Sequence, residues 1–156
     1  ICFFSIMAAA AEEVFNTAHD FKFLELQRDL RDNPKGPHVR ENLFAIGEYY
    51  FQGNSYVLAA DYFRRFGPAE LKKTEDLLAM VYLVRCADLS GDSGAAELMG
   101  KKLEETLSAG SFFASFNSKR FWSWKSPLGN RFDFRELVDR LEISLNDNPF
   151  YTINLS

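Results

Sequence analysis

The sequence has few of the residues from which metal, redox and nucleophilic sites are built. It contains two histidines, His19 and His38, and two cysteines, Cys2 and Cys86. Their spacing fits neither the paired cysteines of zinc and dithiol sites nor the HExxH zinc motif. The GxGxxG, phosphate-loop and GxSxG patterns are missing as well. The sequence therefore predicts no metal, no cofactor and no enzymatic activity.

Long apolar runs and an excess of positive charge are also missing. No stretch reaches the ~18 uninterrupted apolar residues that suggest a transmembrane helix. The formal net charge is -4, whereas nucleic-acid-binding domains usually carry a basic face. We therefore expect neither a transmembrane segment nor a nucleic-acid partner. Hydrophobic residues make up 47% and charged residues 26% of the chain, which is the balance of an ordinary folded domain.

The first residues differ in character from the rest. The segment from Ile1 to Met7 is apolar and is followed by four alanines, as at the end of a secretory signal and its cleavage site. On this interpretation residues 1–10 are a signal remnant, residues 11–149 form one helical domain in the periplasm or outside the cell, and residues 150–156 form an extended tail. The alternative is an amphipathic first helix, since alanine is the best helix former; the protein is then cytoplasmic.

Residues 37–66 predict two helices that fold back on each other. Apolar side chains recur every three or four positions over 39–51 and again over 56–66, which is the spacing of one buried helix face. The turn GNS at 53–55 separates the two runs and offers a cap for the second helix. The Gly-Pro pair at 67–68 ends that helix. Because the turn is so short, the two helices are expected to form an antiparallel hairpin.

A second hairpin is predicted over residues 68–108. Apolar residues again follow helical spacing on both sides of a break at Gly91 and Asp92. The segments GNSYVLAA and GDSGAAEL each open the second helix of a hairpin with small residues. Aligning Ala59 with Ala96 gives a period of 37 residues, within the range of helical repeat arrays.

The stretch from Glu41 to Phe66 resembles a tetratricopeptide repeat. The apolar, glycine, aromatic, turn and alanine positions of that family are taken here by Leu43, Ile46, Gly47, Tyr50, Asn54, Tyr56, Ala59 and Phe63. A second, degraded copy keeps Met80, Leu83, Gly91 and Ala96. It has Val84 and Gly100 where the family has Gly and Phe, so a related array of hairpins is the alternative. The resemblance covers residues 40–108 and implies a short α-solenoid of stacked antiparallel hairpins.

The flanking segments predict further helices, so that the expected fold is all-α with about six or seven helices. One stripe, over 21–32, ends at DNPKGP. A later helix, with Asp133 and Glu136 as its capping box and NDNP at its end, is predicted from the stripe of Leu137, Val138, Leu141 and Leu145. The closing YTINLS alternates apolar and polar residues, which predicts an edge strand or an extended tail.

Aromatic residues crowd the segment 112–125, namely Phe112, Phe113, Phe116, Phe121, Trp122 and Trp124. One interpretation is that these rings close the open end of the helical array, which needs a cap. The other is a binding platform for a small ligand, a glycan or a peptide, formed by Trp122, Trp124 and Lys125. Both interpretations use the large surface that an aromatic ring buries.

The resemblance implies a non-catalytic adaptor or scaffold that binds a peptide or helix of another protein. In that family the first helix of each hairpin lines a concave groove, and the matching positions here are Glu41, Phe44, Glu48, Phe51, Gln52, Leu78, Val81, Arg85 and Asp88. Phe44 and Phe51 lie off the main apolar stripe, so they are either exposed in the groove or packed on preceding helices. Two hairpins are near the minimum for an array, so a homo-oligomer is a further expectation. With a signal segment, the resemblance implies a scaffold in the bacterial cell envelope.

Overall fold

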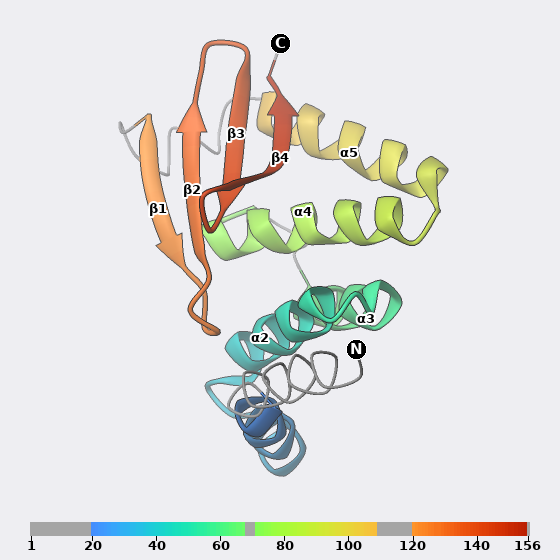
Figure 1. Ribbon diagram of the computed structural model, residues 1–156, viewed down its shortest axis with the longest axis vertical. Helices are drawn as coiled ribbons and strands as arrows, with labels where there is room; N and C mark the ends of the chain where they lie inside the picture. The colour runs from blue at the N-terminus through green and yellow to red at the C-terminus, as the bar shows by residue number, and fades with distance from the viewer. Residues whose placement is uncertain (1–19, 68–70, 109–119, 156) are drawn as a thin grey trace, which may run out of the picture.

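The protein combines a layer of helices with one antiparallel sheet (Figure 1). The computed structural model describes residues 20–67, 71–108 and 120–155. Within these ranges a first helix spans 20–32. It is followed by α2 (Val39–Gln52), α3 (Tyr56–Phe66), α4 (Thr74–Leu89) and α5 (Ser93–Ser108). The sheet contains β1 (Phe121–Lys125), β2 (Arg131–Glu136), β3 (Arg140–Leu145) and β4 (Asn148–Asn154). The prediction of an all-α fold is therefore wrong.

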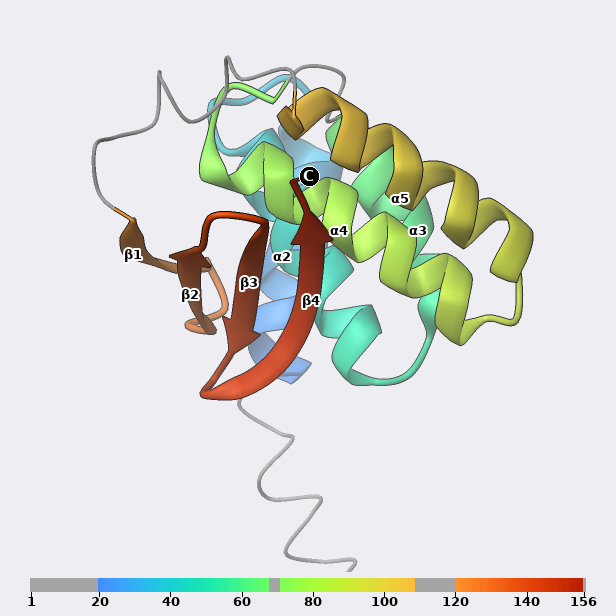
Figure 2. The same cartoon turned by 90° about the horizontal axis from the view of Figure 1, so that it is seen from above.

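Both predicted helical hairpins are present. A short turn joins α2 to α3, and another joins α4 to α5. Gly67 ends α3 with a φ of 71°, a left-handed conformation that glycine adopts without steric cost. Figure 2 shows α3, α4 and α5 side by side. After α5 the described chain enters the sheet instead of a third hairpin, so the predicted solenoid of six or seven helices is wrong as well.

The sheet is a meander in which each strand pairs antiparallel with the next. Asn146 and Asp147 join β3 to β4 with φ angles of 49° and 67°. Two consecutive positive φ angles are the signature of a type I′ turn, which Asn and Asp tolerate. The sequence NDNP is thus a two-residue turn followed by the first two residues of β4, not the end of a helix. Of the two alternatives predicted for the closing residues, an edge strand and an extended tail over 150–156, the structure shows the strand, since β4 lies at one edge of the sheet and reaches Asn154.

Residues 133–145 form most of β2, the connection that follows it, and β3, not the predicted helix. Alternate residues face the core, namely Phe132, Phe134, Leu141 and Ile143, and this period of two overrode the helical spacing. Val138, part of the predicted helical stripe, is 96% exposed in the connection between β2 and β3. Asp133 and Glu136 form no capping box, because both lie in β2.

Tyr82 of α4 lies where the helices meet the sheet. It is 1% exposed and its ring packs against rings from four other elements. These are Phe44 and Phe51 of α2, Phe63 of α3, Phe132 of β2 and Phe150 of β4, with centroids 4.4 to 6.0 Å away. The helices and the sheet therefore share one core. Trp122 and Trp124 pack on this core from β1, whereas Phe112, Phe113 and Phe116 lie outside the described residues.

Gly47 allows α2 and α3 to approach closely. A Cβ atom at this position would lie 2.8 Å from two carbons of the Phe63 ring. We expect Gly47→Ala to lower the free energy of unfolding by about 1–3 kcal/mol through overpacking, although alanine favours a helix more than glycine does. In the control Gly94→Ala, in α5, the new Cβ meets nothing closer than 4.0 Å. Chemical denaturation measures both variants, and a Gly47→Ala protein as stable as the wild type would contradict this packing.

Candidate functional site

The face of α2 that was predicted to line a groove packs against the chain's own sheet. Phe44 is 1% exposed, and its ring centroid lies 5.4 Å from that of Trp124 in β1. Phe51 contacts Phe150 of β4, with ring centroids 6.0 Å apart. Both rings therefore belong to an interface inside the protein, which sequence periodicity alone did not indicate.

The predicted groove positions of α4 are divided between the core and the surface. Leu78 and Val81 are fully buried. The Nη1 atom of Arg85 lies 3.6 Å from the Oδ2 atom of Asp88, and its guanidinium carbon is 5.9 Å from the centroid of the Phe150 ring. Of the nine predicted groove residues, those that remain exposed are Glu41, Gln52 and Asp88. The sheet occupies much of the space in which the sequence predicted a partner.

Glu48 is a buried carboxylate at this contact between α2 and the sheet. None of its surface is exposed, and its Oε2 atom accepts a hydrogen bond of 2.6 Å from Nδ2 of Asn130. The Oδ1 atom of Asn130 in turn accepts hydrogen bonds from Gln52 (3.0 Å) and Asn146 (3.1 Å). The other carboxylate oxygen, Oε1, has no hydrogen-bond partner among the described residues. A network of amide side chains around a single buried acid thus connects α2 to the turn before β2.

Burial raises the pKa of Glu48 from its ordinary 4.5 to about 7. Hydrogen bonds from Asn130 and Ser126 favour the ionised form and limit this rise. Burial and, secondly, the nearby Glu48 carboxylate also raise the pKa of Tyr82. At neutral pH the buried carboxyl of Glu48 therefore lies close to its own titration point.

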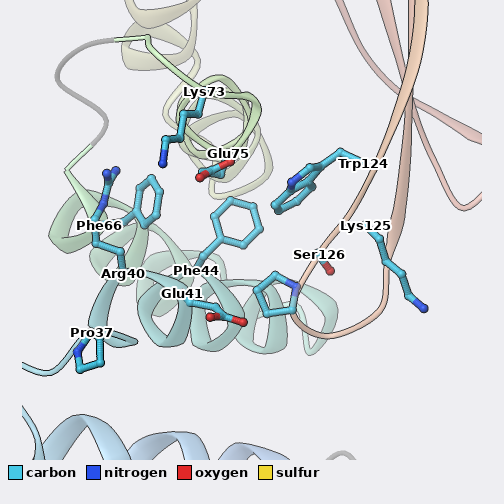
Figure 3. A pocket seen from close by; sticks show the side chains of 11 residues that line it. Pro37, Arg40, Glu41, Phe44, Phe66, Lys73, Glu75, Trp124, Lys125 and Ser126 are labelled. Atoms are coloured by element: carbon cyan, nitrogen blue, oxygen red, sulfur yellow. The ribbon is translucent and has the colours of Figure 1, made fainter.

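A cavity of about 630 Å³ lies between β1 and the helices (Figure 3). Its lining comes from the start of α2, the end of α3, the start of α4, and the end of β1 with the turn that follows. The lining residues are Pro37, Arg40, Glu41, Phe44, Phe66, Lys73, Glu75, Trp124, Lys125, Ser126 and Pro127. This volume is typical of sites that bind a small molecule or a protruding side chain. Ser126, which is 5% exposed, belongs both to this lining and to the surroundings of Glu48.

Charged side chains surround an aromatic interior in this cavity. Phe44, Phe66 and Trp124 supply the rings, and Figure 3 shows the indole of Trp124 facing the ring of Phe44. Lys73 and Glu75 extend from the start of α4 toward the cavity (Figure 3). The lining therefore combines these rings with three cationic side chains, Arg40, Lys73 and Lys125, and two anionic ones, Glu41 and Glu75.

Arg40 holds one wall of the cavity in place. Its Nη2 atom donates a hydrogen bond of 2.8 Å to Oδ1 of Asp76, and its guanidinium carbon lies 4.1 Å from the centroid of the Phe66 ring. Asp76 is 4% exposed, and its Oδ2 atom accepts the backbone N–H of Lys73 at 3.0 Å. A single charged pair, with its planar guanidinium stacked on a ring, therefore joins α2, α3 and the start of α4.

The cavity brings together residues of two sites that the sequence predicted separately. Glu41 and Phe44 belong to the predicted groove, whereas Trp124 and Lys125 belong to the predicted aromatic platform, and all four line the cavity. Trp122 is not among the lining residues. Its ring stacks on Phe134 of β2, with centroids 4.9 Å apart and planes 2° from parallel.

Seven of the eleven lining residues were not predicted as parts of a site, and three of these, Arg40, Phe66 and Lys73, form its walls at the helix ends. Phe66 was identified as a core residue of its helix, and it is indeed 5% exposed. Lys73 stands immediately before α4, a position that helix-start signals can indicate but that carries no sign of binding. Only the placement of β1 against these helix ends makes the three residues neighbours.

Within the described ranges, no helix is long and apolar enough to cross a bilayer. Over the same residues, no group of three or more His, Cys, Asp and Glu side chains could hold a metal ion. Comparison of the chain with protein-family models, with curated proteins and with solved structures gave no match.

Proposed function

We propose that the protein is a non-catalytic binding module that holds a side chain of another protein in the cavity between β1 and the helices. The observation that carries this proposal is the aromatic interior of Phe44, Phe66 and Trp124 beneath charged groups. Aromatic and arginine residues in a water-excluding pocket with a polar rim are typical of the centre of protein interfaces. We expect the partner to insert an aromatic or large aliphatic side chain.

The walls of the cavity are fixed before any partner binds. Phe44 is held by the rings of Phe63 and Tyr82, and Phe66 by the Arg40 guanidinium. A site built from immobilised side chains loses little conformational entropy on binding. Rigid walls therefore support a binding role for this cavity.

The charges at the mouth give the partner a second requirement. Lys73 is exposed and extends toward the cavity (Figure 3), so it can contact an acidic group that flanks the inserted side chain. Glu75, two residues further along the chain, disfavours a second acidic group of the partner near the Lys73 ammonium. The proposed partner segment thus combines a large apolar residue with a neighbouring acidic residue.

Peptides selected from a random display library on the wild-type protein test this function. We expect enrichment of peptides with an aromatic residue, and a loss of at least about tenfold in affinity, about 1.4 kcal/mol, for Lys73→Glu. Lys102→Glu, which makes the same charge change on the exposed face of α5, is the matched control. Selected peptides that bind wild type and Lys73→Glu equally would contradict a role for the cavity.

A small ligand or glycan is the second candidate for the same cavity. The indole of Trp124 forms one of its walls, and aromatic faces beside polar groups are suited to such ligands. Binding of a glycan panel, followed by tryptophan fluorescence, separates this candidate from the first. The predicted location in the bacterial cell envelope stays a prediction, because residues 1–10 lie outside the described residues.

A further inference from the structure

β1 is an edge strand whose outer side is open within the described residues. The sheet order is β1-β2-β3-β4, so β1 pairs with β2 alone. The opposite edge strand, β4, has α5 beside it (Figure 2). An open edge presents unpaired N–H and C=O groups to which another strand can pair.

The hydrogen bonds of β1 show which backbone groups face outward. The N–H of Glu136 donates to the carbonyl of Arg120, and the N–H of Ser126 donates to the carbonyl of Asn130, both at 2.8 Å. Even-numbered residues of β1 thus direct their backbone groups to β2, because these groups alternate sides along a strand. The N–H and C=O groups of Phe121, Ser123 and Lys125 point to the open side.

The side chains of these outward-bonding residues favour a particular neighbour. Phe121 is 59% exposed. Lys125 stands directly opposite Arg131 of β2, and like charges in that position are unfavourable. The positive charge of Arg131 is compensated by two carboxylates, that of Asp133, whose Oδ2 atom lies 3.1 Å from Nε of Arg131, and that of Asp147. Lys125 has no carboxylate within ion-pair distance among the described residues, so a new strand gains by placing an electron-rich group beside it.

We propose that β1 pairs antiparallel with β1 of a second copy, across a twofold axis at Ser123. In this register Ser123 faces Ser123 of the second copy, and Phe121 faces Lys125 of the second copy. All the outward N–H and C=O groups of both strands then find partners, because the same three residues bond on each side. The two sheets join into one continuous sheet.

The pairing suits a second copy of β1 because the strand is complementary to itself. Each Lys125 lies beside the ring of a Phe121, which is a favourable cation–aromatic contact. The central pair is two small hydroxyl side chains, and no like charges stand directly opposite each other in the register. The exposed Phe121 ring is covered at both ends of the paired strands.

Ser123→Pro tests the pairing, with Ser123→Ala as its matched control. Both variants remove the hydrogen bond from the Ser123 hydroxyl to Asp133, but only proline removes the outward N–H. Proline is tolerated in an edge strand when its nitrogen faces solvent. We expect sedimentation equilibrium to show a monomer–dimer equilibrium for the wild type and for Ser123→Ala, and at least about tenfold weaker dimerisation for Ser123→Pro.

A charge exchange tests the register and does not depend on proline. Phe121→Lys places two lysines opposite each other and is expected to weaken the dimer at least about tenfold, whereas adding Lys125→Glu to it restores dimerisation through an opposite-charge pair.

A wild type that stays monomeric at millimolar concentration would overturn the proposal. A dimer that neither Ser123→Pro nor Phe121→Lys weakens would overturn it too. Lys73→Glu should dimerise like the wild type, so the two proposals fail independently.

Discussion

Tyr82→Ala is expected to lower the free energy of unfolding by about 3–5 kcal/mol, the usual cost of deleting a buried ring. The side chain is 1% exposed and lies between the rings of two helices behind it and two strands in front of it. Removing the Tyr82 ring therefore takes a packing partner from the helices and from the sheet at once. We expect helical circular dichroism and tryptophan fluorescence to shift to the same lower denaturant midpoint.

The two tryptophans make this comparison sharp, because Trp122 and Trp124 both lie in β1 and report on the sheet and, through Trp124, on its contact with α2. Leu98→Ala is the control, since Leu98 is 72% exposed on α5 and its removal should change stability by less than about 0.5 kcal/mol. If the fluorescence transition of Tyr82→Ala kept the wild-type midpoint while the helical signal moved, the helices and the sheet would not share one cooperative core.

Glu48→Gln is expected to remove a pH dependence of stability worth roughly 3 kcal/mol. Burial raises the pKa of Glu48 to about 7 in the folded protein, against an ordinary value of 4.5. Below pH 4.5 the carboxyl is neutral in both the folded and the unfolded state. As the pH rises toward 7 the unfolded chain ionises first, so that the folded state becomes relatively less stable. Above about pH 7 the folded protein carries the full cost of a buried charge.

The measurement is the free energy of unfolding of wild type and variant from acid to mildly alkaline pH. We expect the difference between the two proteins to change in favour of Glu48→Gln as the pH rises, whatever its value at acid pH. Glu41→Gln, at an exposed position of the same helix, should follow the wild-type curve. Parallel curves for wild type and Glu48→Gln would show that the carboxyl is not held in the buried, hydrogen-bonded position.

This titration also bears on the candidate site. Ser126 lines the cavity and contributes a hydrogen bond that lowers the pKa of Glu48. The backbone N–H of Asn130 donates to the hydroxyl of Ser126 at 3.0 Å. The buried acid, the turn before β2 and one wall of the cavity are therefore parts of the same hydrogen-bonded structure.

The sequence by itself determined the helical hairpins and their ends. Apolar spacing, the turn at 53–55 and Gly67 are local signals, and the helices α2 and α3 begin and end where those signals predict. Local alternation in the closing residues allowed an edge strand or an extended tail and did not decide between them. Residues 133–145 were misread because their leucines satisfy a helical period while Phe132, Phe134, Leu141 and Ile143 satisfy a period of two. Which period applies depends on the neighbouring strands that pair with the segment.

Only the tertiary structure decided what fills the space beside α2 and where a site forms. From the sequence, Phe44 and Phe51 fitted exposed groove positions as well as buried ones. In the structure Trp124 of β1 packs on Phe44, and Phe150 of β4 packs on Phe51, so that the sheet helps to bury Phe44 and partly buries Phe51. Residues 40, 66, 73 and 124 become walls of one cavity only when β1 lies against the helix ends. Contacts between residues so far apart along the chain are set by the packing of whole elements, and no local pattern in the sequence records them.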